Sequence, residues 1–212
     1  PVIEDAAQSF GAQYHGKQSC NLSTLGCTSF FPSKPLGCYG DGGAIFTSDD
    51  ALAQACREIR IHGQSRRYTH TRVGVGGRMD TLQCAVVLAK LERFDWEVAQ
   101  RQQLGARYNS LCDAAGIARM AQRAERSSVF AQYTVHVPER AQVQEKLQAA
   151  GIPTAVHYPV PLNKQQAYAG RCHRPTPVAE QLAAEVMSLP MSADLQPQEQ
   201  DAVLYALRVA LA

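Results

Sequence analysis

Apolar and polar residues follow two different periods along this chain, and each period predicts one kind of element. Short apolar runs occur at residues 2–3, 28–31 and 44–47, and each run is bounded by Gly, Pro or Asp. Short bounded runs of this kind are typical of buried strands. The first fifty residues are therefore predicted to contribute strands to a buried sheet.

Longer segments carry apolar residues three or four positions apart, which predicts helices. We expect a helix over residues 49–61 and a long helix from 81 to about 115, with a bend at Gly105. Residues 60–78 are basic and rich in glycine without an apolar period, so a loop is expected there. Later in the chain we expect helices at 140–150, 178–187 and 198–211, and strands at 131–137 and 152–158.

This order of elements predicts an α/β fold followed by a smaller α+β domain. We place the boundary within the long helix, with a large domain over residues 1–92 and a small domain over residues 93–212. The chain has 212 residues and 45% hydrophobic content, which is enough for one or two packed cores.

Charge and cysteine usage exclude several classes of protein. Lys and Arg number 21 against 19 Asp and Glu, so no net field indicates binding to nucleic acid or to a membrane surface. The seven cysteines contain no CxxC pair, so neither a metal site nor a disulfide framework is expected. Buried thiols in a reducing cytoplasm are the simpler interpretation.

Two residues near the predicted strands carry the candidate chemistry. Lys34 follows an apolar run between two prolines, and Asp5 ends the first run with Gln8 three residues on. Pyridoxal phosphate chemistry needs an amine to hold the aldehyde and a carboxylate to keep the ring nitrogen protonated. A solvated lysine and a strand-end cap are the ordinary alternatives, and the combination of the two groups favours the catalytic interpretation.

The segment Gly40-Asp41-Gly42-Gly43 has the composition of a phosphate-binding loop but lacks the GK[ST] ending of a Walker motif. Glycines in such a loop allow positive φ or a close approach of one chain segment to another. We therefore expect the run to serve backbone conformation.

A family resemblance follows from these motifs taken in order. The segments 4–8 and 74–83, the pair Ser29-Phe30, Lys34 and the glycine loop resemble the DegT/DnrJ/EryC1/StrS sugar aminotransferases. The resemblance implies an aspartate-aminotransferase-like fold of PLP fold type I. It implies that residues 1–92 are the C-terminal part of the PLP-binding large domain. It also implies that the chain lacks an N-terminal segment present in the family.

The resemblance assigns four residues to the cofactor pyridoxal 5'-phosphate. Lys34 forms the Schiff base and later moves a proton, and Asp5 pairs with the pyridinium nitrogen. Ser29 donates its hydroxyl to the phosphate, and Gln8 lies against the ring near its phenolic oxygen. Lys34 is thus expected to be both catalytic and cofactor-binding.

Three further residues are implied to bind substrate: Arg78, His157 and Tyr158. An exposed arginine and a hydrogen-bonded structural histidine are the ordinary alternatives. Most family members have Asn where this chain has Gly76, so the cofactor-phosphate contact made by that Asn is missing. The backbone amides of Gly76 and Gly77 are candidates to replace it.

The implied function is transfer of an amino group from L-glutamate to the 3-keto carbon of a UDP-2-acetamido-hexuronic acid. The expected setting is cytoplasmic synthesis of bacterial surface polysaccharide, such as the O-antigen of lipopolysaccharide. A homodimer with shared active sites is expected, with no metal and no nucleic-acid or membrane partner. Two alternatives stay open: a deoxysugar dehydratase of the same fold, in which histidine usually replaces the lysine, or a catalytically silent dimerisation or interaction module.

Overall fold

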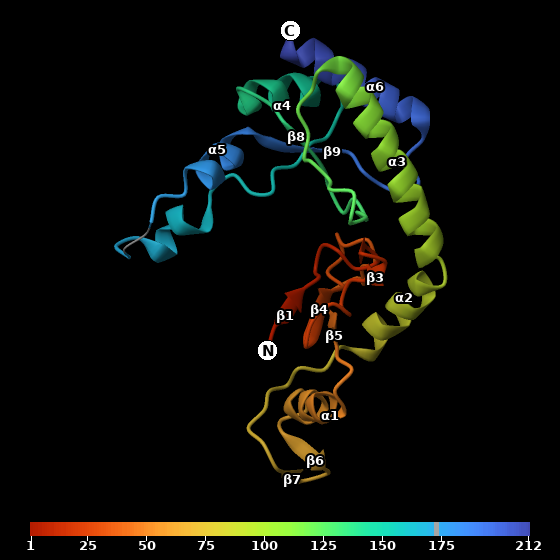
Figure 1. Cartoon of the computed structure of the whole chain (residues 1–212), viewed down its shortest axis with the longest axis vertical. Coiled ribbons are helices and arrows are strands. Elements are labelled where there is room, and N and C mark those ends of the chain that lie inside the picture. Colours follow the sequence, from red (N-terminus) through yellow and green to blue (C-terminus); the bar gives the residue numbers. More distant parts are fainter. Residues whose placement is uncertain (172–173) are drawn as a thin grey trace. The chain divides into compact units, whose positions relative to one another are not determined.

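The computed structural model describes residues 1–171 and 174–212, so one of the seven cysteines, Cys172, lies outside the described residues. The chain forms two compact units (Figure 1). The first comprises Pro1–Ala99 and Gln122–Ala131, and the second comprises Gln100–Ala121 and Gln132–Ala212.

A three-stranded sheet with the order β1-β4-β5 organises the first unit. Its strands are β1 (Ile3–Asp5), β4 (Leu25–Ser29) and β5 (Gly43–Phe46). β1 runs parallel to β4 and β5 runs antiparallel to it. The three predicted strands are therefore confirmed, with shifts of a few residues at their ends. A small hairpin of β2 (Gln13–Tyr14) and β3 (Lys17–Gln18) lies between β1 and β4 in the chain.

The expectation that these strands are buried is wrong for part of the sheet. Ile3 of β1 is 67% exposed and Ile45 of β5 is 57% exposed. Both belong to edge strands, which have β4 as their only neighbour in this sheet. Apolar composition alone cannot distinguish an edge strand from a central one, because the two use the same residue types.

Three helices accompany the sheet: α1 (Asp50–Ile59), α2 (Thr81–Leu91) and α3 (Phe94–Ala115). Asp49 begins α1 by accepting hydrogen bonds from the Ala51 and Leu52 amides at 2.8 and 3.0 Å. The long helix predicted over residues 81–115 is interrupted at residues 92–93, whereas Gly105 lies inside α3. The break lets Val87 of α2 and Phe94 of α3 pack into one core.

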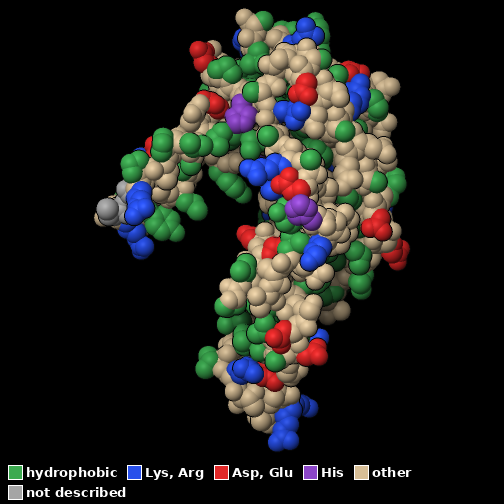
Figure 2. All heavy atoms as spheres, in the orientation of Figure 1, with side chains coloured by type: hydrophobic (Ala, Val, Ile, Leu, Met, Phe, Trp, Pro, Cys, Tyr) green, Lys and Arg blue, Asp and Glu red, His purple; other side chains and the backbone are tan. Residues whose placement is uncertain are grey.

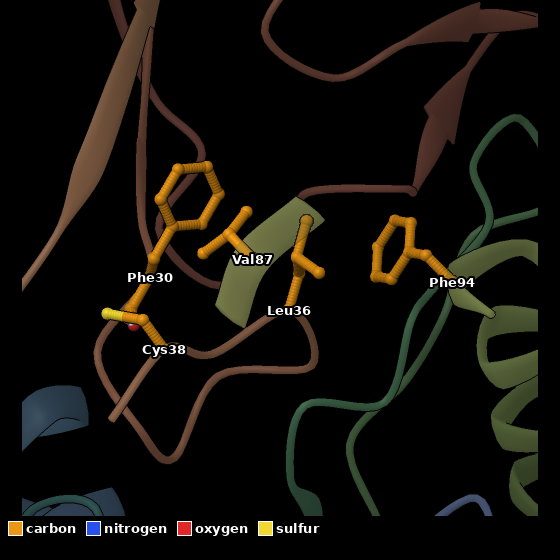
Figure 3. Packing of buried hydrophobic residues seen from close by; sticks show 5 residues of the cluster. All are labelled: Phe30, Leu36, Cys38, Val87 and Phe94. Atoms are coloured by element: carbon orange, nitrogen blue, oxygen red, sulfur yellow. Dashed lines mark hydrogen bonds between the residues drawn. The ribbon is translucent and has the colours of Figure 1, made fainter. Parts of the chain in front are cut away.

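That core ties the segment before β5 to the helices. Figure 3 shows side chains from three parts of the chain: Phe30, Leu36 and Cys38, then Val87 of α2, and Phe94 at the start of α3. All five are at most 9% exposed. The loop between β4 and β5 is thus anchored on both sides of Lys34.

The predicted loop over residues 60–78 contains a hairpin of β6 (Gln64–Arg66) and β7 (Thr69–His70). Tyr68 adopts a φ of 64° at its turn. The hairpin is built from polar residues, so it has no apolar period by which to be recognised. Figure 2 shows Lys or Arg side chains gathered at the end of the first unit where β6 and β7 lie.

The second unit contains a two-stranded antiparallel sheet of β8 (Tyr133–His136) and β9 (Val186–Leu189). Its helices are α4 (Arg140–Ala149), α5 (Pro177–Glu185) and α6 (Pro197–Leu211), with short 3₁₀ turns η1 (Leu162–Lys164) and η2 (Gln166–Tyr168). The predictions for β8 and these three helices are confirmed, except that α5 ends earlier. Residues 186 and 187 belong to β9, whose four residues are all buried.

The strand predicted over residues 152–158 is wrong. Only Ala155 pairs there, in an isolated bridge to Ser188 of β9. Exposed and half-buried residues alternate through this segment as they would in a strand, but a single bridge does not extend into a ladder.

The domain boundary predicted between residues 92 and 93 coincides with the break between α2 and α3, while the two compact units divide inside α3. The boundary itself stays a prediction. No helix within the described residues is long and apolar enough to span a membrane.

Candidate active site

Asp5 and Ser29 lie at the end of the three-stranded sheet where β1 and β4 finish. We call this end the sheet edge, and it is distinct from the lateral edge strands β1 and β5. The two residues end the parallel strands β1 and β4, and Asp5 is in register with Cys27. Residues that pair, and residues two apart on a strand, share a face of a sheet. The spacing of strands and residues puts the two Cα atoms about 8 Å apart. A carboxylate and a hydroxyl therefore project from the same face at the same edge.

Each of these two side chains makes a local hydrogen bond. The Asp5 carboxylate accepts from the Ala7 amide at 3.0 Å, and the Ser29 hydroxyl oxygen accepts from the Phe31 amide at 3.2 Å. Asp5 is exposed and Ser29 is half-buried. Gln8 is exposed in the turn that follows β1. Within the described part of the chain, no cation pairs with Asp5.

Lys34 lies in the loop that leaves the sheet at this edge and returns as β5. The Phe30 amide donates to the Gly42 carbonyl at 2.8 Å, which closes the base of the loop, and the Lys34 amide donates to the Phe31 carbonyl at 2.9 Å. Lys34 is half-buried, and among residues 1–171 and 174–212 its amine has no hydrogen-bond or ion-pair partner.

Two residues of α2 hold this loop. The Lys90 ammonium donates to the Gly37 carbonyl at 2.6 Å, and the Gln83 side-chain oxygen accepts from the Tyr39 amide at 2.7 Å. With Leu36 and Cys38 packed in the core, the backbone around Lys34 is fixed on both sides.

Gly42 and Gly43 of the glycine loop allow neighbouring chain segments to approach closely, and neither is required for a positive φ. A Cβ on Gly43 would come within 2.6 Å of the Thr28 carbonyl, and one on Gly42 within 2.6 Å of the Met79 methyl group. Neither glycine has a positive φ. A larger residue at position 43 would therefore push β5 away from β4, whereas one at position 42 would displace the end of the Met79 side chain.

Arg78 is exposed and lines a hollow of about 1160 Å³ in the first unit. Gly42, Gly43 and Thr28 line the same hollow, so it reaches from Arg78 to the edge of the sheet. Asp5, Gln8, Ser29 and Lys34 are not among its lining residues. The hollow is therefore a neighbour of the cofactor residues and not their pocket.

Titration of groups around the hollow is set by burial and by hydrogen bonds. Burial, and after it the Glu4 carboxylate, raises the pKa of the Cys20 thiol to about 11, so this thiol is neutral near pH 7. Hydrogen bonds from the Gln54 amide and then from Arg72 lower the pKa of Glu58. Glu58 is consequently ionised although it is only 8% exposed.

The suggested pair of glycine amides is not free to bind an anion as a pair. The Gly77 amide donates to the Arg60 carbonyl at 2.8 Å, and this bond belongs to the isolated bridge between Gly76 and Ile61. An anion site made of both amides would require this bridge to open.

His157 and Tyr158 lie in the second unit, after α4, and both are exposed. The His157 Nδ1 atom is 3.2 Å from the Ser188 hydroxyl of β9. The rings of His157 and Tyr158 meet edge to face at 5.6 Å. Their role in binding substrate stays a prediction.

The structure thus groups Asp5, Ser29 and the loop of Lys34 at one sheet edge and puts Arg78 in the adjacent hollow. Sequence reasoning did not single out Glu58 or the arginines Arg57 and Arg60 that also line the hollow. Their sequence signal is that of an ordinary solvated helix, so only the fold reveals them.

Comparison with known proteins identifies the family and the fold of the chain. The model of the DegT/DnrJ/EryC1/StrS aminotransferase family matches residues 1–208. The UDP-2-acetamido-2-deoxy-3-oxo-D-glucuronate aminotransferase of Pseudomonas aeruginosa is 61% identical over 191 residues, which are 90% of this chain and 53% of that protein.

Two crystal structures share the fold. A DegT/DnrJ/EryC1/StrS aminotransferase from Brucella abortus has a TM-score of 0.93 at 38% identity, covering 99% of this chain and 57% of that one. S. venezuelae DesV, in complex with a ketimine intermediate, has a TM-score of 0.93 at 36% identity, covering 98% and 57%.

This chain spans a little more than half the length of the relatives it matches. Over that span its mixed α/β fold is the same as theirs, with a TM-score of 0.93 to each, as the resemblance implied. Because the family model also covers nearly every residue, the chain belongs to the DegT/DnrJ/EryC1/StrS aminotransferase family.

Proposed function

We propose that this protein is a pyridoxal-phosphate-dependent aminotransferase of nucleotide sugars. Its substrates are L-glutamate and the 3-keto form of a UDP-2-acetamido-hexuronic acid. The observation that carries the reaction class is the grouping of Asp5, Ser29 and the loop of Lys34 at one sheet edge. The 61% identity to the Pseudomonas aeruginosa enzyme supports the sugar.

The chemistry of the donor set fits the cofactor. Pyridoxal phosphate needs an amine for its aldehyde, an anion for its ring nitrogen and donors for its phosphate. Lys34 supplies a half-buried amine, Asp5 a carboxylate that no described cation neutralises, and Ser29 a hydroxyl. The three groups therefore match the three parts of the cofactor.

When bound, pyridoxal phosphate supplies a ring that accepts the electron pair left by a broken C–H bond. Asp5 keeps a proton on the ring nitrogen, because a carboxylate stabilises the cationic form. Ser29 would hold the phosphate through its hydroxyl, and Gln8 is the residue proposed to contact the ring. The Lys34 amine would hold the cofactor through its aldehyde and, as a free amine, could move a proton at the amino donor's Cα.

Three residues are proposed to bind substrate. Arg78, which lines the hollow beside the sheet edge, is assigned to an anionic group of the sugar nucleotide. His157 and Tyr158 are assigned to the sugar end of the substrate. The cytoplasmic setting and a role in O-antigen synthesis belong to this proposal as predictions that follow from the substrate class.

The test is covalent trapping at Lys34. Pyridoxal phosphate is added to the protein, the mixture is reduced with borohydride, and the label is located by peptide mapping. We expect the label on Lys34 and its loss in Lys34→Ala, together with a fall in transamination of roughly 10³-fold or more.

Lys17→Ala is the matched control, because Lys17 is an exposed lysine at the start of β3. It is expected to keep both the label and the activity. A label on any lysine other than Lys34 contradicts the assignment. Absence of any label supports the catalytically silent module, and a labelled enzyme that forms no amino sugar with glutamate points to another reaction of this fold.

A further inference from the structure

A buried carboxylate in α1 takes no part in the proposed chemistry. Glu58 is 8% exposed, and one of its oxygens accepts from the Arg72 guanidinium at 2.8 Å and from the Thr71 hydroxyl at 3.2 Å. The other oxygen accepts from the Gln54 side chain at 2.9 Å. Glu58 therefore joins α1 to a segment that follows it by more than ten residues.

The main chain continues this junction. The Gly63 amide donates to the Glu58 carbonyl at 2.8 Å, and the Val75 amide donates to the Ile59 carbonyl at 2.8 Å. The next bond runs from the Gly77 amide to the Arg60 carbonyl, also at 2.8 Å. Residues 71–77 therefore pack along the C-terminal end of α1, and the β6–β7 hairpin lies between α1 and these residues in the chain. We call this packing of residues 71–77 on α1 the seating of the segment.

Arg78 follows directly on this segment and is held from both sides. Gly77 before it is bonded to Arg60, and Met79 after it packs against the core of Phe30 and Val87. The Arg78 side chain then forms part of the wall of the hollow. Its position depends on the seating of residues 71–77 on α1.

Glu58 also differs from the other contacts of this segment because it carries a negative charge in a basic part of the chain. Between residues 57 and 78 the chain has six arginines, and Glu58 is its only carboxylate. An ionised Glu58 neutralises one of these positive charges, that of Arg72, within the segment. Loss of this charge is expected to loosen the segment and to release Arg72.

We propose that Glu58 is a positioning residue for substrate binding. Through Arg72 and Thr71 it seats residues 71–77 on α1 and so places Arg78 where it meets the anionic sugar nucleotide. This inference rests on the proposed function for the role of Arg78, whereas the seating of the segment is independent of that function.

The kinetic test is a double-mutant cycle in the holoenzyme, with UDP-2-acetamido-2-deoxy-3-oxo-glucuronate and glutamate as substrates. Glu58→Gln is expected to raise the KM for the sugar about tenfold, with less than about a twofold change in kcat and in the KM for glutamate. In an Arg78→Ala background, Glu58→Gln is expected to raise the KM no further.

Two further variants test whether the effect is specific to the Glu58–Arg72 pair. Arg72→Met removes the other partner of the pair and is expected to raise the KM for the sugar as Glu58→Gln does. Asp113→Asn weakens an Arg–carboxylate ion pair of similar length in the second unit, in which Arg119 donates to Asp113 at 2.8 and 2.9 Å. It is expected to leave both KM values unchanged.

Hydrogen exchange tests the seating without any substrate. Glu58→Gln is expected to accelerate exchange of the Val75 and Gly77 amides and to leave the His136 amide of β8 unchanged. Unchanged exchange at Val75 and Gly77 would overturn the seating. An equal rise of KM with and without Arg78 would show that Glu58 does not act through Arg78. If the parent protein fails to aminate the sugar while exchange still responds, the proposed function fails and the seating stands.

Discussion

At the scale of single residues, the charge of Asp5 separates a catalytic role from a structural one. Its carboxylate accepts one hydrogen bond, from the Ala7 amide at 3.0 Å. An asparagine oxygen can accept the same bond, so the turn after β1 does not need the negative charge. A pyridinium nitrogen does need it, because a neutral partner does not hold the proton there.

Asp5→Asn is therefore expected to keep the fold and to lower kcat by roughly 10²-fold or more, since the protonated ring loses its counter-charge. Thermal unfolding checks the fold, and single-turnover kinetics with glutamate check the chemical step. Asp41→Asn, a change of the same kind in the glycine loop, serves as a control for loss of one charge. Turnover of Asp5→Asn within a few-fold of the parent would remove Asp5 from the mechanism.

At the scale of elements, the seating of residues 71–77 depends on Gly63. This residue has a φ of +75°, and a Cβ there would lie 1.8 Å from the Arg72 carbonyl oxygen. The Thr71 amide donates to the Gly63 carbonyl at 3.0 Å. Gly151, which ends α4, has the same φ of +75°, but its Cβ would meet no atom within 4 Å.

Substituting Ala at Gly63 and at Gly151 separates the cost of backbone strain from the cost of a steric clash. Gly151→Ala should cost about 1–2 kcal/mol, because only the left-handed conformation opposes it. Gly63→Ala should cost clearly more and should accelerate hydrogen exchange of the Thr71 amide, because residues 71 and 72 must move away. Urea unfolding and hydrogen exchange measure the two effects. Equal costs for the two variants would mean that the approach of Arg72 to Gly63 does not stabilise the segment.

At the scale of the whole molecule, the exposed apolar residues near Arg78 favour an interface. Tyr68 is 79% exposed, Val73 96% and Val75 61%, all within a segment that carries a proposed substrate residue. Ordering an exposed segment of this length costs conformational entropy that a partner surface would offset. We expect a homodimer in which each site is completed by residues 60–78 of the other subunit.

Mixing two inactive variants tests this assembly. Lys34→Ala and Arg78→Ala chains form mixed dimers in which one site gathers both defects and the other site is intact. Each mixed dimer is expected to recover up to about half the activity of the parent dimer, because one of its two sites is intact. The control is Arg78→Ala alone, which must be impaired. If subunit exchange is confirmed and activity does not return, Arg78 acts within its own subunit.

Much of the fold could be predicted because its signals are local. Asp49 before an apolar period marks the start of α1, and the bounded apolar runs mark the strands β4 and β5. The hairpin β6–β7 and the break between α2 and α3 were missed. The first has no apolar period, and the second is set by the packing of Phe94, which lies in the core with residues far away in sequence.

Some residues of the candidate site could likewise be predicted from the sequence, and others were found only in the structure. Asp5 and Lys34 were predicted from sequence because an amine and a carboxylate follow bounded apolar runs, and Ser29 was predicted from the family resemblance. The sequence by itself determined these residue types, the strands that carry them and the family. Only the tertiary structure decided that Glu58 binds Arg72 and seats the segment before Arg78, because a contact across fourteen residues arises from the return of the chain onto α1 and leaves no periodic trace in the sequence.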